Sequence, residues 1–437
     1  MKALASLAAV AAAMTTTAAA ADIALVHAGK LLAVPGRPAL ANQTVVIRDG
    51  RVAAVLPGFV EAAAAGAGPS DKVAVYDLKD MFVLPGLTDS HVHILSENNP
   101  RQRLERVEQS ESDLAIAGAG FAKKTLMAGF TTVRDVGAGP SDAIFALRDG
   151  IARGDVIGPR IFASGATISV TGGHGDGTQG YRDDVAELLH SNGVCDGPDD
   201  CRRAVREQIR RGADHIKLTS TGGVLSNTAA GLEQQFSDDE LKAIVEAAHA
   251  MGRKVTAHAH GVSGINGALR AGVDSIEHGS YLSSESVSLF RKTGAYLVPT
   301  LLAGETVGNW AEDPNSFLLP PQRAKAREVA PQLEAMAKRA RAAGLKIAFG
   351  TDTGVSAHGD NAREFELLVA AGYTPMEAIR FATVAAADHL GKSDVMGTIE
   401  PGKYGDLVAV GGDPTVDVGE LRDIDFVMKE GVAYKRP

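Results

Sequence analysis

Short apolar runs alternate with helix-like segments through most of this sequence, and this alternation constrains the fold more than any other feature. The segments between the runs carry helical periodicity and charge, as in DDCRRAVREQIRRGA. A strand followed by a helix, eight times in succession, predicts an α/β fold, a (β/α)8 TIM barrel. The eight runs between Val83 and Asp352 are VLPGLTDSHVHI, FTTVRD, RIFASG, HIKLTS, KVTAHA, DSIEHG, YLVPTL and KIAFGTD.

The two ends of the chain have a different character from this middle. Strand-like runs with turn residues occur in IALVHAGKLLAV, QTVVIRDGRVAAVLP and VAVYDLKDMFVLPG, and again in GTIEPGKYGDLVAVGGD and IDFVMKEGVAYKR. Asp49-Gly50 between two alternating segments indicates a hairpin. We therefore expect a small β-sandwich domain formed by residues 22–82 and 391–437, with the barrel spanning residues 83–390.

The first 21 residues have the layout of a secretory signal peptide. Lys2 precedes an apolar run from Ala3 to Met14, and small residues follow up to Asp22. The run is too short to span a bilayer, and no later stretch resembles a membrane span. The alternative is an alanine-rich N-terminal helix. We expect cleavage near Ala20–Asp22 and an exported enzyme, periplasmic or secreted.

Charge and cysteine content exclude several classes of protein. The 44 Lys and Arg against 53 Asp and Glu give a formal charge of −9, which argues against nucleic-acid binding. The two cysteines, Cys195 and Cys201, cannot form a disulfide framework or a Cys-only zinc site. In an oxidising compartment they could form one small loop disulfide; otherwise they are two independent thiols.

Residues that bind metals or carry protons gather at the ends of the predicted strands. His91 and His93 form an H-x-H in which strand periodicity directs both imidazoles to one side. His258 and His278 end two further strands, and Asp352 ends the last one. Barrel active sites lie where the strands end, whereas a doubly wound sheet gives no reason for this distribution. Imidazole and carboxylate together suit zinc and similar divalent ions.

Lys217, in HIKLTS, is the unusual member of this set. A buried protonated lysine would repel metal ions and lose its hydration, and no acidic partner is evident in the same strand. A neutral, desolvated amine could instead react with carbon dioxide to form an anionic carbamate between two metal ions.

Together these residues resemble the amidohydrolase superfamily, in its binuclear class with a carboxylated lysine. Local stretches are similar to the imidazolonepropionase-like and Xaa-Pro dipeptidase (prolidase)-like subgroup, including enzymes that hydrolyse ochratoxin A. The resemblance covers nearly all of the mature chain, although Tyr404-Gly405-Asp406 stands where the family more often has Ala-Asp. Lys217 speaks against imidazolonepropionase itself, whose site is mononuclear. The matching stretches are LPGLTDSHVH, GFTTVRDVG, GPRIFASG, TGGHG, GADHIKLTSTGG, AHAHG, IEHG, GTDTG and GTIEPGKYGDLV.

The resemblance implies two divalent metal ions, expected to be Zn²⁺. By residue-by-residue transfer, His91, His93 and Asp352 hold one ion, His258 and His278 hold the other, and carboxylated Lys217 lies between them. A bridging hydroxide would attack the scissile carbonyl, and Asp352 would pass its proton to the leaving nitrogen.

Further residues are predicted to contact substrate. His260 lies two residues past His258, so its side chain should face the pocket. There it would contact a substrate carbonyl or carboxylate, or it would support a metal ligand. His174 lies in a glycine-rich loop that lacks the ending of a phosphate-binding loop. Arg134 could pair with a substrate carboxylate or with Asp135. Ser96 could border the pocket, and His358 and Glu364, which flank the loop after the eighth run, are weaker candidates.

The subgroup resemblance implies a small-molecule or dipeptide substrate with an amide-linked C-terminal amino acid. Xaa-Pro and other dipeptides, N-acyl amino acids and ochratoxin A fit this description, with ochratoxin A as a leading candidate. A lactonase or cyclic amidase would use the same metal site. A non-catalytic scaffold would be expected to have lost some ligands, whereas here all of them are present. The resemblance also implies a homo-oligomer, with an octamer as one expected state.

Overall fold

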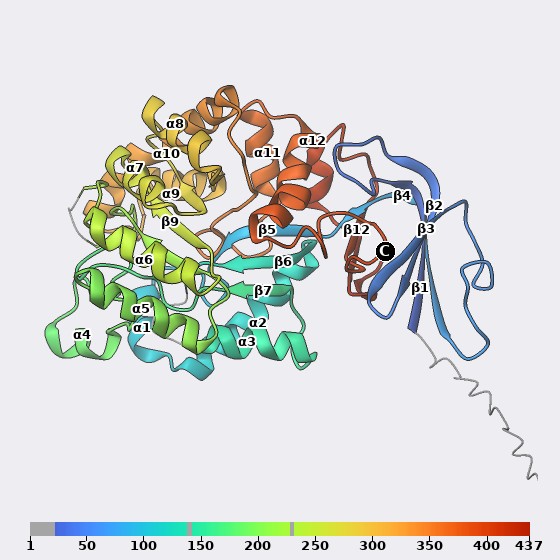
Figure 1. Ribbon diagram of the computed structural model, residues 1–437, viewed down its shortest axis with the longest axis horizontal. Coiled ribbons are helices and arrows are strands. Elements are labelled where there is room, and N and C mark those ends of the chain that lie inside the picture. Colours follow the sequence, from blue (N-terminus) through green and yellow to red (C-terminus); the bar gives the residue numbers. More distant parts are fainter. Residues whose placement is uncertain (1–21, 138–141, 228–230) are drawn as a thin grey trace, which may run out of the picture.

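The computed structural model of the protein describes residues 22–137, 142–227 and 231–437. The predicted signal segment, residues 1–21, lies outside the described residues. Within the described ranges, no helix is both long and apolar enough to cross a membrane. Figure 1 shows two parts, a β-sheet built from both ends of the described chain and a body of parallel strands surrounded by helices.

The strands of the two chain ends form one seven-stranded sheet, in the order β14-β13-β12-β4-β1-β2-β3. Asp49 and Gly50 connect β2 to β3 with positive φ angles of 48° and 78°, which confirms the predicted hairpin. The strands are β1 Asp22–Leu31, β2 Leu40–Arg48, β3 Arg51–Pro57, β4 Lys72–Pro85, β12 Leu407–Val410, β13 Phe426–Lys429 and β14 Val432–Lys435.

Strand β4 joins the N-terminal and C-terminal strands of this sheet. It pairs in parallel with β1 and, near its end, antiparallel with β12, where Val83 lies opposite Ala409. Apolar side chains from both ends of the chain, such as Val26 and Phe426, share one buried cluster. Hydrogen bonds join all seven strands into one sheet, because β4 is long enough to pair with strands from both ends of the chain.

The body of the molecule follows the predicted alternation of strand and helix. Seven of the eight predicted runs contain a strand: β5 Leu87–Val92, β6 Phe130–Asp135, β7 Arg160–Ala163, β8 Ile216–Thr219, β9 Val255–Ala259, β10 Ser275–His278 and β11 Tyr296–Val298. The helices are α1 Gln102–Glu108, α2 Glu111–Met127, α3 Ala143–Arg153, α4 Asp183–Leu189, α5 Pro198–Arg211, α6 Asp238–Ala250, α7 Val262–Ala271, α8 Ser284–Thr293, α9 Leu301–Glu312, α10 Pro320–Ala343, α11 Arg363–Ala370, α12 Pro375–Arg380 and α13 Ala386–Leu390, with a π-helical turn at Phe381–Ala385 and a 3₁₀ helix at Val418–Arg422.

The parallel strands are hydrogen-bonded into two sheets, β5-β6-β7 and β8-β9-β10-β11, rather than into one closed barrel. Single parallel bridges connect the two sheets. Ile168 after β7 bridges Leu218 in β8, and Leu297 in β11 bridges Ile347. The eighth predicted run, residues 346–352, is not a named strand, but its neighbour Thr353 bridges Val92 at the end of β5. Runs that are adjacent in the structure are therefore also consecutive in the sequence.

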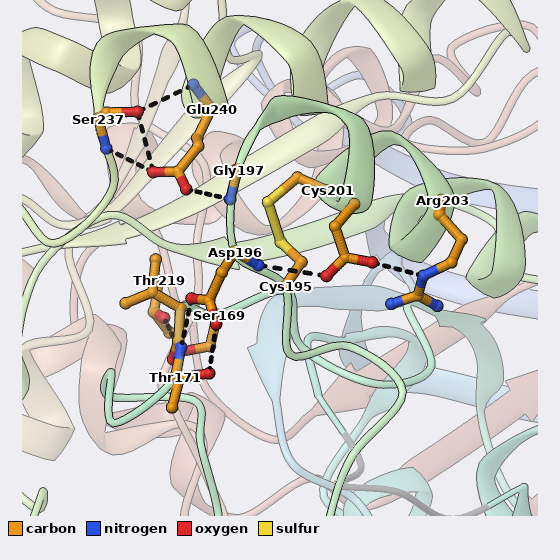
Figure 2. Close-up of a disulfide and its surroundings, with 12 residues drawn as sticks. Ser169, Thr171, Cys195, Asp196, Gly197, Cys201, Arg203, Thr219, Ser237 and Glu240 are labelled. Atoms are coloured by element: carbon orange, nitrogen blue, oxygen red, sulfur yellow. Dashed lines mark hydrogen bonds and ion pairs between the residues drawn. A yellow bond between two sulfur atoms is a disulfide. The ribbon is translucent and has the colours of Figure 1, made fainter.

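Helix α6 and the loop before α5 support the part of this body that carries His174. Ser237 and Glu240 form the predicted capping box at the start of α6. Cys195 and Cys201 form a disulfide with a Cα–Cα distance of 5.0 Å, which confirms the predicted pair. Figure 2 shows both features, linked by the Gly197 N–H, which donates to Glu240 Oε1 at 2.6 Å.

Candidate metal centre

Two groups of ligand atoms lie next to each other at the ends of the parallel strands. One group comprises His91, His93 and Asp352, and within it the potential ligand atoms all lie within 4.8 Å of one another. The other comprises His258, His260 and His278, under the same limit. The ring centroids of His91 and His278 are 5.2 Å apart, so the two groups adjoin. The structure thus brings together the five His and Asp residues predicted as ligands and adds His260.

The backbone leaves the extended conformation where two of these side chains project. His278 has a φ of 68° and Asp352 a φ of 61°, both in the left-handed region. Such conformations cost about 1–3 kcal/mol in residues other than glycine and often occur at functional sites. The Asp352 N–H donates to the His91 carbonyl at 2.7 Å, which places its carboxylate beside the H-x-H pair.

His91 is oriented by a buried carboxylate that the sequence analysis did not identify. Its Nδ1 lies 2.7 Å from Glu277 Oε2. Burial alone would raise the pKa of Glu277, but the charges of Arg134 and His91 bring it well below its usual range. The ionised carboxylate can only accept a hydrogen bond, so His91 Nδ1 donates to it and Nε2 is directed toward Asp352.

Arg134, predicted as a substrate contact, has a different environment in the structure. Its side chain is 4% exposed, and its guanidinium donates to Glu277 Oε1 at 2.8 Å. The same group donates through Nε to the Ser90 carbonyl at 2.6 Å. Arg134 is thus bound to Glu277 rather than to Asp135, and it lies among buried residues that support His91.

His93 and Asp352 complete the first group with acceptor atoms. His93 Nδ1 donates to the Gly137 carbonyl at 2.9 Å, which leaves Nε2 facing Asp352 Oδ1 at 3.2 Å. His91 Nε2 lies 3.4 Å from the same oxygen. Asp352 Oδ1 is buried and has no hydrogen-bond partner among the described residues. Burial would lower the pKa of His93, but Asp352 raises it above the usual value. Two imidazole Nε2 atoms and a carboxylate oxygen this close together can bind a cation once the rings are neutral.

Side-chain hydroxyls orient two of the imidazoles in the second ligand group, those of His260 and His278. Thr300 donates its only hydroxyl hydrogen to the Pro299 carbonyl at 2.8 Å, so it accepts from His278 Nδ1 at 2.7 Å. His260 Nδ1 contacts Ser280 Oγ at 2.7 Å. Burial and the neighbouring imidazoles hold the pKa of His258 and His278 well below the usual range. These rings are therefore neutral, as metal binding requires.

Lys217 lies in β8, which pairs with β9, the strand that carries His258, and its side chain is buried. Burial lowers its pKa to about 8, although the charges of Glu277 and Asp352 oppose this shift. Among the described residues, no ion pair within 4.0 Å involves its amine. At pH 8 about half of such amines are neutral, which is the form that reacts with carbon dioxide.

His174 reaches the second group from its glycine-rich loop, as predicted for a pocket residue. Its ring centroid is 4.2 Å from that of His258, and its Nδ1 contacts Ser226 Oγ at 2.6 Å. A Cβ atom on Gly223 would lie 2.2 Å from the His174 ring, so only glycine allows this packing. Burial lowers the pKa of His174 to about 3.

The remaining predicted residues form contacts of their own. His358 is buried, packs on Phe121 and donates through Nε2 to the carbonyl of Ser96, which is exposed. Glu364 is fully buried and accepts the N–H groups of Leu301 and Leu302 at 3.0 and 2.7 Å. It therefore holds the start of α9, which follows Thr300 directly.

Glu277, Thr300 and Ser280 are the residues of the site that the sequence analysis missed. Glu277 immediately precedes His278, and regular strand alternation would place the two on opposite faces. The left-handed turn at His278 removes this restriction, so both adjacent side chains contribute. The motif IEHG carried a signal, an acid inside an apolar strand, that could have identified Glu277.

Comparison with known proteins agrees with this geometry. The sequence profile of the amidohydrolase family matches residues 82–434. A crystal structure of a Xaa-Pro dipeptidase with methionine bound in its active site has a TM-score of 0.87 and 39% identity, covering 95% of this chain and 100% of that chain. Ochratoxinase from Aspergillus niger is 31% identical over 444 residues, covering 95% of this chain and 88% of its own length. Its crystal structure has a TM-score of 0.82.

Imidazolonepropionase from Sphingopyxis alaskensis is more distant, at 27% identity over 83% of this chain and 86% of its own length. The family and these neighbouring structures imply a TIM-barrel fold with an additional domain, and hydrolysis of carbon–nitrogen bonds. The family match covers most of the sequence and includes every residue of both ligand groups. The chain belongs to the amidohydrolase family.

Proposed function

We propose that the protein is a metal-dependent hydrolase that cleaves the amide bond to a C-terminal amino acid. The observation that carries this proposal is the first ligand group. Nε2 of His91, Nε2 of His93 and Oδ1 of Asp352 converge there, and the Nδ1 atom of each ring is hydrogen-bonded elsewhere, to Glu277 and to the Gly137 carbonyl. A divalent cation satisfies all three acceptors at once.

Two metal ions are proposed, in keeping with a family that is generally binuclear. His91, His93 and Asp352 would hold one, and His258 and His278 the other, with Lys217 as a carbamate between them. Imidazole nitrogens with carboxylate oxygens are the ligand set that zinc prefers, so Zn²⁺ is the proposed ion. His260 lies close enough to act as a further ligand or, as proposed here, to contact substrate beside the second ion.

The metal ions would polarise the scissile carbonyl and lower the pKa of the attacking water. Asp352 accepts the proton of that water on its carboxylate and transfers it to the leaving nitrogen. His91 and His93 hold the pKa of Asp352 well below its usual range despite burial, so the carboxylate is ionised and can serve as a ligand. His260 and His174 orient the substrate, because both rings are neutral and lie beside His258.

The proposed substrates are Xaa-Pro and other dipeptides, N-acyl amino acids and ochratoxin A. The similarity to a Xaa-Pro dipeptidase and to ochratoxinase supports this choice, since both names describe hydrolases of such compounds. We also propose that the enzyme is exported, because residues 1–21 have the layout of a signal peptide and the Cys195–Cys201 disulfide suits an oxidising compartment.

Product analysis by mass spectrometry tests the proposal. The purified, zinc-loaded enzyme would be incubated with ochratoxin A, Xaa-Pro and other dipeptides, N-acyl amino acids and a lactone. Asp352→Asn should lose bound metal and at least about 10³-fold in turnover, because it removes a ligand and the proton acceptor. Asp360→Asn is the matched control, since Asp360 pairs with Arg422 at the surface.

Release of a free C-terminal amino acid by the wild type, lost in Asp352→Asn but kept in Asp360→Asn, would support the proposal. Full turnover in Asp352→Asn would overturn the assigned role of this residue. Turnover of the lactone alone, with metal bound, would move the function to ester or cyclic-amide hydrolysis on the same site.

A further inference from the structure

We infer that Glu277, held in place by Arg134, makes the His91–His93–Asp352 group the tighter of the two metal positions, so that this position fills first. The inference rests on the proposed binuclear site but concerns the order and strength of metal binding. It assigns a positioning role to two residues that do not themselves contact a metal ion or substrate.

A carboxylate lies directly behind His91 in the first group. Glu277 is fully buried, and its Oε2 accepts from His91 Nδ1 at 2.7 Å. The other carboxylate oxygen accepts from Arg134 at 2.8 Å, from Ser275 Oγ at 2.9 Å and from Thr256 Oγ1. A carboxylate behind an imidazole fixes its tautomer and makes the facing nitrogen a stronger ligand.

The corresponding partners in the rest of the site are neutral. The Gly137 carbonyl supports His93 at 2.9 Å, and the hydroxyl of Thr300 supports His278 at 2.7 Å. Ser280 Oγ contacts His260 at 2.7 Å. The second group also has no carboxylate ligand among the described residues, whereas the first has Asp352. The carboxylate behind His91 and the carboxylate ligand Asp352 both favour binding of a cation by the first group.

Arg134 secures this arrangement at two points. One nitrogen binds Glu277, and Nε binds the carbonyl of Ser90, the residue immediately before His91. The same guanidinium therefore fixes the carboxylate behind the imidazole and the backbone that carries the imidazole. A buried arginine–carboxylate pair of this kind also keeps the carboxylate ionised without exposure to water.

The first experiment is a zinc titration of the metal-stripped wild type in bicarbonate buffer, followed by isothermal calorimetry and chelator competition. Two binding steps of different affinity are expected, separated by at least about tenfold. Asp352→Asn should remove the tighter step, and Thr300→Val should weaken only the other. Two equal steps in the wild type, or a tight step that survives Asp352→Asn, would overturn the inference.

Glu277→Gln tests the carboxylate itself, with Glu285→Gln at an exposed ion pair as the control. Glu277→Gln should weaken the tighter step about 10- to 100-fold and leave the weaker step unchanged. Because this variant leaves Arg134 uncompensated, a second variant combines Glu277→Gln with Arg134→Met. If the tight step returns in the double variant, Glu277 only neutralises Arg134 and the inference fails; if it stays weak, the positioning role holds.

These measurements do not depend on turnover. A protein that binds two unequal zinc ions but hydrolyses none of the tested amides would sustain this inference and overturn the proposed substrate class. If neither Glu277 variant folds, the wild-type titration with Asp352→Asn and Thr300→Val still decides whether the first position is the tighter one.

Discussion

At the scale of single residues, the hydrogen-bond partner of each imidazole determines how that ring is oriented and which nitrogen faces the site. Thr300 donates to Pro299 and so must accept from His278, while ionised Glu277 must accept from His91. Each partner binds Nδ1 and so directs Nε2 toward the centre of the site. A water molecule in place of either partner would allow both tautomers, so buried partners make the ligand set ready for metal before it binds.

Lys217 leads to a prediction about pH at this scale. Burial lowers its pKa from 10.5 to about 8, so the folded protein favours the neutral amine. The neutral fraction rises about tenfold per pH unit below pH 8 and levels off above it. Reactivation of metal-stripped enzyme by zinc and bicarbonate should therefore accelerate about tenfold from pH 6 to 7, as measured by recovered turnover.

The carbamate itself would be detected by NMR with ¹³C-bicarbonate. Lys217→Gln should lack this signal, whereas Lys242→Gln, at an exposed position in α6, should retain it. Reactivation that is independent of pH between 6 and 8, or independent of bicarbonate, would contradict the role given to Lys217.

At the scale of elements, the disulfide supports a loop that reaches the site. Cys195 and Cys201 join the loop before α5 to its first turns. Between them, Asp196 accepts from Thr171 Oγ1 at 2.6 Å, as Figure 2 shows. Thr171 begins the TGGHG loop that carries His174, so the carboxylate of Asp196 is one of the links between the disulfide and this loop.

Replacing both cysteines by serine should lower the free energy of unfolding by about 2 kcal/mol, the effect of opening so short a loop. The measurement is the denaturation midpoint under non-reducing conditions. Bound zinc should be unchanged, because none of the proposed ligands lies in this loop. Loss of metal together with stability would show that the loop supports the ligands more directly than the contacts indicate.

At the scale of the whole molecule, a largely buried ion pair is one of the contacts that join the terminal sheet to the body. Arg160, at the start of β7, donates to Asp406 Oδ2 at 2.9 Å and lies 3.7 Å from the Tyr404 ring centroid. Tyr404 is the position where this sequence departs from the more frequent family pattern, and the structure gives it a role as a surface for this arginine. This difference from the family pattern therefore lies where the terminal sheet meets the body, and not in the metal site.

Metal binding should stabilise the whole fold, because the ligands come from distant segments of the chain. Free zinc at a hundred times its dissociation constant should add about 2.7 kcal/mol per site. Calorimetry should therefore show a higher unfolding temperature in zinc-loaded than in chelator-treated enzyme, with a smaller increase in Asp352→Asn. An unfolding temperature that does not respond to chelation would contradict a metal site at these residues.

The sequence by itself determined the alternation of strand and helix, the hairpin at Asp49-Gly50, the capping box at Ser237 and the His and Asp residues that meet at the strand ends. These features depend on local periodicity and turn chemistry, which act over a few residues. Arg134 shows the limit of such reasoning, since its partner Glu277 is far away in the chain, in β10 of the other sheet, and only the arrangement of the two sheets brings them together.

Only the tertiary structure decided the rest. The left-handed backbone at His278 and Asp352 breaks strand alternation, and a pattern of period two does not contain it. The union of seven strands in one terminal sheet required β4 to pair with strands from both ends of the chain. The proton arrangement around the imidazoles depended on Glu277, Gly137 and Thr300, which are separated in sequence and become neighbours only when the strands lie side by side.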